Sequence, residues 1–300
     1  MDKPLVSPSP TPTVLPPQPP PPPKKSLPII FIVLGVVGII LILGFILFRP
    51  RAEKQLPKPK IAEAVNTVPT SDRPYVTLEP GDSGGDNPEH KDHPIGTEVL
   101  LKVYTVTLNA AEAEYELEYQ AGSLLQAAIG TMSLTSEQLP IYRNMLLGSC
   151  SAGGKCDYNK DVSGGTLLLR LSGGSQKFAV KGEWTYQLMG EREGKFSSRD
   201  SKFRVDVGSA GLPSSTYVII MQTMGLPEAP EGEIVAGPYH ISVGKVSVKS
   251  AEVSVRVPEE ATDAKLLGWT GSDWKEYKSI VSDQTLTATV DSFTTFVVVK

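Results

Sequence analysis

A chain of 300 residues has room for one or two domains, at about 100–200 residues per domain. Its formal net charge of −4 is small for this length, and its C-terminal two-thirds hold no basic stripe interleaved with aromatic residues. Both observations argue against nucleic acid as a partner.

Proline dominates the N-terminal stretch, residues 1–26. A proline run has few amide donors and a preset extended backbone, so it has little to bury in a core. We therefore predict a disordered tail of polyproline type.

The next segment, residues 27–48 (LPIIFIVLGVVGIILILGFILF), contains no charged residue. As a helix it would be about 33 Å long, which is enough to cross a hydrocarbon core of about 30 Å. A cleaved signal peptide is the alternative, but its apolar region usually has about 7–15 residues. The segment predicts an uncleaved transmembrane signal anchor that contacts the lipid bilayer.

Residues 49–97 are rich in proline, lysine, glycine and aspartate and show no periodicity, so they predict a flexible linker or stalk. More basic residues follow the apolar segment than precede it. Counted literally, the positive-inside rule would place the C-terminal part in the cytoplasm, although long domains translocate largely regardless of charge.

Period-two alternation begins near residue 98 and recurs to the C-terminus, between turns rich in glycine, proline and serine. In EAEYELEY, glutamates fall on one face and mostly apolar residues on the other, which is typical of a strand with one face in water. Many short strands predict an all-β fold with two antiparallel β-sandwich domains, 98–207 and 208–300. The water-facing residues of that first example are Glu112, Glu114, Glu116 and Glu118.

One stretch, residues 123–147, departs from this period-two alternation (SLLQAAIGTMSLTSEQLPIYRNMLL). Its composition favours short helices, which would be broken at Pro140 and closed by Gly148.

The last ninety or so residues contain, in order, EIVAGPYHISVG, AEVSVRVPEEAT, AKLLGWTGSDWKEYKSIV and QTLTATVDSFTTFVVV. This series resembles the C-terminal β-sandwich modules of bacterial and archaeal cell-surface proteins, akin to the ankyrin- and netrin-receptor type of sandwich. The shared motifs concern packing, so the resemblance implies a fold and a surface location rather than a reaction.

The first half is similar to cohesin-like sandwiches through VYTVTLNAAEAEYELEYQAGSLL and GGTLLLRLSGG. In that family an alternating strand leads into a Y-x-x-x-x-L turn, and Tyr119 and Leu124 occupy those positions. The Asp-Pro commonly found between them is absent here.

Two cysteines, Cys150 and Cys156, are the only ones in the chain. Redox motifs favour two residues between the thiols, and a zinc site would need further ligands. Asp157, Asn159 and Asp161 match the first calcium-loop positions, but the turn glycine and the final glutamate are missing. A disulfide fits best, and calcium at the loop remains the alternative.

No catalytic constellation is evident, so we predict no catalytic residues, no cofactor and a protein that is not an enzyme. The histidines of EHKDH, His90 and His93, lie in the predicted linker. Trp184, Trp269 and Trp274 are expected to pack in cores or edges, with a sugar-stacking platform as the alternative.

Disulfides persist outside the cytoplasm, and this outweighs the basic-residue count. The sequence predicts a single-pass cell-membrane protein whose N-terminus is cytoplasmic and whose β-sandwich domains are extracytoplasmic. Its expected role is structural or partner-binding in the cell envelope, the partner being a surface protein or cell-wall polysaccharide. The alternative is a cohesin-like carbohydrate- or scaffold-binding module.

Overall fold

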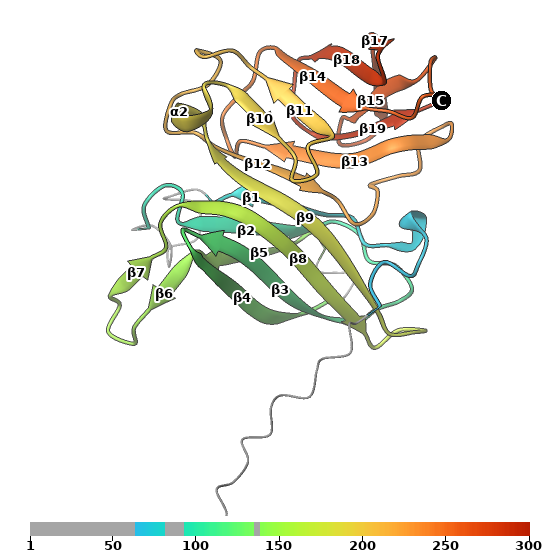
Figure 1. The fold of residues 1–300 in the computed structure, drawn as a ribbon. Coiled ribbons are helices and arrows are strands. Elements are labelled where there is room, and N and C mark those ends of the chain that lie inside the picture. Colours follow the sequence, from blue (N-terminus) through green and yellow to red (C-terminus); the bar gives the residue numbers. More distant parts are fainter. Residues whose placement is uncertain (1–63, 82–92, 135–138) are drawn as a thin grey trace, which may run out of the picture. The chain divides into compact units, whose positions relative to one another are not determined.

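The computed structural model describes residues 64–81, 93–134 and 139–300 (Figure 1). The predicted tail (1–26), the predicted signal anchor (27–48) and most of the predicted linker lie outside these residues. Within the described ranges, no helix combines the length and apolar character that a membrane crossing requires.

The described part of the chain is all-β, and its strands pair antiparallel within four sheets. The three-stranded sheet has the order β1 (Val76–Pro80), β2 (Glu98–Val103), β5 (Ile141–Leu146). The five-stranded sheet has the order β10 (Lys195–Ser197), β11 (Phe203–Asp206), β14 (Ala251–Arg256), β18 (Thr285–Val290), β17 (Ser279–Ser282). The two-stranded sheet is the hairpin of β6 (Gly148–Cys150) and β7 (Cys156–Tyr158).

The largest sheet has nine strands and runs through both halves of the folded chain. Its order is β16 (Trp274–Tyr277), β15 (Lys265–Trp269), β19 (Thr295–Val299), β13 (Ile234–Ser242), β12 (Tyr217–Gln222), β9 (Phe178–Leu188), β8 (Val162–Ser172), β3 (Glu112–Ala121), β4 (Leu124–Ser133). Two short helical turns complete the described elements, η1 (Thr70–Asp72) and α2 (Met189–Arg192).

Two hydrophobic cores lie between these sheets. The first joins the three-stranded sheet, through residues such as Leu78 and Leu101, to Leu117 and Trp184 of the nine-stranded sheet. The second joins the five-stranded sheet to the other end of the nine-stranded sheet. Its members include Phe203, Val205, Val253, Val255, Leu286, Ile241, Phe296 and Val298.

Strand β12 serves both cores with its two faces. Ile219 and Met221 pack into the first core, whereas Val218 and Ile220 pack into the second. Successive side chains of a strand point to opposite faces, so a strand buried on both sides reads as a continuous apolar run, as TYVIIMQTM does. The predicted boundary near residue 208 therefore falls between two strands, β11 and β12, that contribute to the same second core.

The alternation in β3 is confirmed. Ala113 and Leu117 are buried, whereas Glu112 and Glu114 are exposed. Strand β3 turns into β4 through Gly122, whose φ of 55° a glycine adopts without steric cost. All ten residues of β3 then pair with β4, from Glu112 opposite Ser133 to Ala121 opposite Leu124.

The helices predicted over 123–147 are wrong, because the described residues of this stretch form strands β4 and β5. Intrinsic helix propensity is a weak preference that tertiary pairing overrides. The hairpin with β3 supplies backbone partners along the full length of β4, and β5 pairs with β2 in register from Glu98–Leu146 to Val103–Ile141.

The linker predicted over 49–97 is also wrong where it includes β1. Val76 and Leu78 are fully buried in the first core, and β1 pairs with β2 from Val76–Val103 to Pro80–Val99. The apolar alternation in this strand is short and flanked by prolines, which are typical of turns. The strand could therefore not be distinguished from the surrounding linker by its sequence.

Candidate functional site

The two cysteines face each other across the hairpin of β6 and β7, and a disulfide joins them, as predicted. Their Cα atoms are 4.0 Å apart. The connecting loop is closed by backbone hydrogen bonds from Ser151 N to Lys155 O and from Gly154 N to Ser151 O, each of 2.9 Å. Residues 151–155 are exposed, so the disulfide sits at the base of a solvent-facing tip.

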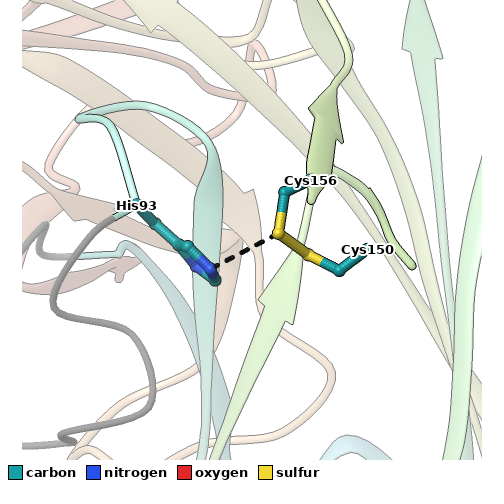
Figure 2. A group of neighbouring side chains, drawn as sticks. All are labelled: His93, Cys150 and Cys156. Atoms are coloured by element: carbon teal, nitrogen blue, oxygen red, sulfur yellow. Dashed lines mark hydrogen bonds between the residues drawn. A yellow bond between two sulfur atoms is a disulfide. The ribbon is translucent and has the colours of Figure 1, made fainter. Parts of the chain in front are cut away.

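His93 lies against one sulfur of this disulfide (Figure 2). Its Nε2 atom is 3.9 Å from the Sγ atom of Cys156, and its ring meets the ring of Tyr158 edge-on, with 5.8 Å between centroids. Its other ring nitrogen, Nδ1, is 2.7 Å from Oε1 of Glu98. Glu98 is only 2% exposed, so a buried carboxylate orients the imidazole toward the sulfur.

This geometry defines the hydrogen-bonding roles. A carboxylate accepts hydrogen bonds, so Nδ1 of His93 carries a hydrogen and donates a hydrogen bond to Oε1 of Glu98. The Nε2 atom then presents a lone pair to Cys156 when the ring is neutral and an N–H group when it is protonated. The same carboxylate–histidine arrangement supports metal-bound histidines and general bases beside nucleophiles.

Sequence reasoning placed His93 in the linker and missed its neighbours. The contact depends on the start of β2, where Glu98 pairs with Leu146 and Leu147 N donates to Thr97 O. That pairing places the residues just before β2 beside the start of β6. In the described ranges, the group of potential ligands whose atoms lie within 4.8 Å of one another comprises His93, Cys150 and Cys156. The two sulfurs could bind a metal only after the disulfide is reduced.

The calcium candidates lie next to this hairpin. Asp157 is exposed on β7, and Asp161, immediately before β8, has a φ of 53°. The side chain of Asn159 donates from Nδ2 to the hydroxyl of Tyr119 over 2.8 Å. Calcium binding here stays a prediction.

A second candidate region is a cavity of about 670 Å³. The Tyr75 and Tyr104 rings stack with 5.3 Å between centroids, and Tyr104 is 37% exposed. The polar lining includes the ion pair of Lys275 Nζ with Asp291 Oδ2, at 2.6 Å. The aromatic residues that line the cavity are Tyr75, Tyr104, Trp269, Tyr277 and Phe293.

The tryptophans do not form one platform. Trp184 is fully buried in the first core. Trp269 and Trp274 lie on paired strands β15 and β16, with 5.4 Å between their ring centroids. Trp269 lines the aromatic cavity, whereas Trp274 lines a different cavity and donates from Nε1 to Glu228 O over 3.1 Å.

His240 lines the aromatic cavity and is buried. Its Nδ1 atom is 3.0 Å from the hydroxyl of Thr295, which is also 2.7 Å from the hydroxyl of Tyr75. Burial, with a smaller contribution from Lys102, lowers the pKa of His240 to about 3, so the ring is neutral. Burial likewise raises the pKa of Tyr75 well above its usual value.

A third candidate region is strand β4, at the edge of the nine-stranded sheet. Its sequence, LLQAAIGTMS, contains no charged residue and no proline. Leu124, Leu125 and Ile129 are 62%, 66% and 64% exposed.

Carboxylates of β3 lie beside this strand. Arg170 Nη1 is 3.2 Å from Glu114 and 3.2 Å from Glu116, and Thr166 donates to Glu118 over 2.9 Å. Glu118 pairs with Ala127 of β4.

The three regions are defined by their geometry alone, since no family model, no curated protein and no solved structure matches this chain.

Proposed function

We propose that this chain is a non-enzymatic, single-pass membrane protein of the cell envelope that binds a surface protein through its extracytoplasmic β-sandwich domains. In this proposal residues 27–48 cross the bilayer, and a stalk carries two sandwich modules, the second of the bacterial and archaeal surface type. The uncharged segment 27–48 and the Cys150–Cys156 disulfide support the location, because disulfides persist outside the cytoplasm.

The observation that carries partner binding is the edge strand β4. Within the described ranges, its outer side pairs with no other strand. Soluble proteins protect such edges with charges, prolines or bulges, because open backbone groups and apolar side chains invite another strand. β4 has no charged residue or proline, and it exposes Leu125 and Ile129.

The expected occupant is an extended segment of another protein whose every second residue is in turn apolar, basic and apolar, because Leu125, Ala127 and Ile129 lie on one face of β4. Adding a strand supplies backbone hydrogen bonds, and alternate side chains supply specificity. Apolar side chains would cover Leu125 and Ile129. A lysine or arginine opposite Ala127 would reach over this small residue toward Glu118 on β3. Charge complementarity therefore favours a basic segment over an acidic one.

The experiment measures binding of two fluorescent peptides to the full-length chain in detergent. One has valine, lysine and valine at every second position, the other has valine, glutamate and valine there, and both have threonine at the positions between. We expect the valine–lysine peptide to bind and the valine–glutamate peptide not to bind. Ile129→Lys places a charge on the edge and should weaken binding at least tenfold. Ile280→Lys is the matched control, because Ile280 is 70% exposed on β17, an edge strand of the five-stranded sheet.

Equal loss of binding in both variants, or no binding of either peptide, would refute this assignment of β4. A dimer of the chain that Ile129→Lys dissociates would instead identify a second copy as the occupant.

The aromatic cavity favours a second candidate function, a cohesin-like carbohydrate- or scaffold-binding module. Sugar rings stack on aromatic faces while polar groups bind their hydroxyls, and the cavity offers Tyr104 and Trp269 beside Lys275 and Asp291. Retention of the full-length chain on cell-wall polysaccharide, lost in Tyr104→Ala, would support it. A glycan array without any signal would exclude the carbohydrate-binding version.

A further inference from the structure

We propose that the Cys150–Cys156 disulfide undergoes thiol–disulfide exchange with a low-molecular-weight thiol, with Cys150 as the attacked sulfur and Cys156 as the leaving group next to His93. This activity is independent of partner binding by β4. We assign the disulfide more than a structural role because His93 contacts one of its sulfurs and the buried carboxylate of Glu98 orients that histidine.

Access differs between the two cysteines. Cys150 is exposed at the end of β6, whereas Cys156 is half-buried at the start of β7. Exchange requires that a thiolate approach one sulfur along the line of the S–S bond, while the other sulfur leaves. The exposed side of the hairpin therefore admits the incoming thiol at Cys150.

The environment of the two sulfurs differs in the same sense. Nε2 of His93 lies 3.9 Å from the Cys156 sulfur, which is the sulfur that the imidazole contacts directly. A neighbouring imidazolium stabilises a thiolate and makes it a better leaving group. Cys156 is therefore the sulfur that departs.

The step balances as follows. A thiolate RS⁻ attacks Sγ of Cys150, the S–S bond breaks, and its electron pair stays on Sγ of Cys156. The products are a mixed disulfide between RS and Cys150 and a Cys156 thiolate beside His93. A second thiolate then attacks the RS sulfur of the mixed disulfide, the bond from that sulfur to Cys150 breaks, and Cys150 leaves as a thiolate, which gives RSSR and the reduced protein. Overall, two thiols are oxidised, and the protein disulfide gains two electrons and two protons.

His93 acts differently in the return direction. When its ring is neutral, the Nε2 lone pair takes the proton from the Cys156 thiol, and the resulting thiolate attacks the mixed disulfide at Cys150 and expels RS⁻. Glu98 is a positioning residue, because its carboxylate accepts the hydrogen bond of Nδ1–H and thereby keeps Nε2 directed at the sulfur. Among the described residues, those in contact with the imidazole include Glu98 from β2, Tyr158 from β7 and Cys156.

The first test uses the wild-type, full-length chain in detergent and reduced glutathione at pH 7. The chain has two cysteines, so every thiol signal reports on this site. Reaction for increasing times, acid quenching and peptide mass spectrometry should place glutathione on Cys150, with Cys156 free. Equal amounts of glutathione on the two cysteines would overturn the proposal without the need for any variant.

The second test compares rates. His93→Gln should lower the rate of mixed-disulfide formation about tenfold, because the leaving thiolate loses its stabilising neighbour. Glu98→Gln should lower it less, since the amide still contacts the ring. Asp157→Asn is the control, because it removes a carboxylate from β7 that makes no contact with His93 in the described interactions. Rates for His93→Gln within a factor of two of the wild type would refute the proposal.

The third test separates chemistry from structure. In the reduced protein, alkylation of Cys156 by iodoacetamide should persist to lower pH in the wild type than in His93→Gln, where it should follow an ordinary thiol. The pH profile for alkylation of Cys150 should change less between the two proteins, because the imidazole contacts the Cys156 sulfur directly. A purely structural role for His93 would shift both cysteines alike or neither, and that result would contradict the proposal.

Discussion

His240 illustrates how burial determines chemistry at the scale of a single residue. Its side chain is enclosed between β13 and its neighbours, where Nδ1 meets Thr295 and the described residues offer Nε2 no hydrogen-bond partner. Desolvation disfavours the charged ring, which is why its pKa falls from 6.5 to about 3. The residue is therefore a neutral component of the core at physiological pH.

A pH-dependent stability follows from this shift. In the unfolded chain His240 takes up a proton below about pH 6.5, whereas in the folded chain it stays neutral until about pH 3. Its contribution to stability is therefore complete above pH 6.5 and is lost as the pH falls toward 3. As the pH falls from 7.5 to 5, protonation of His240 in the unfolded chain should lower the free energy of unfolding by about 2 kcal/mol.

Urea denaturation of the wild type and His240→Gln at several pH values tests the predicted effect of His240 on the pH dependence of stability. The variant lacks the titrating group, so the stability difference between the two proteins should narrow by that amount as the pH falls to 5. Parallel curves for the two proteins would show that His240 does not titrate as predicted. Carboxylates affect both proteins equally and cancel in the comparison.

At the scale of elements, close approach of backbones explains the small residues of β8. Gly165 lies opposite Tyr119 of β3, and a Cβ atom at this position would come within 2.1 Å of Glu118 O. The indole Nε1 of Trp184 also donates to Glu118 O over 3.3 Å. Gly165, the second glycine of GGTLLLRL, is therefore required by the close packing of β8 on β3 and does not mark a flexible turn.

Replacing this glycine should disrupt the sheet locally. Gly165→Ala forces β8 away from β3 and should lower the free energy of unfolding by about 1–3 kcal/mol. Gly153→Ala is the matched control, because a Cβ there meets nothing closer than Ser151 Oγ at 3.9 Å. Thermal or urea denaturation measures both, and equal stability of the two variants would contradict the inferred close packing.

At the scale of the whole molecule, the proposal depends on which side of the membrane the β-sheets occupy. The described residues contain one disulfide and no free cysteine, so thiol reagents report directly on the hairpin. With the sheets outside the cytoplasm, a membrane-impermeant maleimide should label the chain in intact cells only after treatment with a membrane-impermeant reductant.

The opposite orientation has a different labelling pattern. Cytoplasmic cysteines would stay reduced and would react without reductant, but only after the cells are permeabilised. Labelling of that kind would overturn the proposed location. A cysteine-free variant, with Cys150→Ser and Cys156→Ser, is the control for labelling of other proteins.

The sequence alone determined the class of this fold. Residues that alternate every second position, such as the glutamates of β3, can present one wet and one buried face only as a strand. The cysteine spacing similarly predicted the disulfide, since both partners lie in one short hairpin. These features are local, and local periodicity and turn chemistry can be read from neighbouring residues.

The tertiary structure alone decided the rest, because the decisive partners are distant in the chain. β4 is a strand because β3 pairs with all ten of its residues, although its own composition favours a helix. β1 belongs to the first core because it pairs with β2. β12 contributes to both cores because other strands pack on both of its faces. His93 meets Cys156 only because the β2–β5 pairing brings the start of β2 to the hairpin. Long-range pairing leaves little periodic trace in the segments it joins, so it appears only when the whole chain is folded.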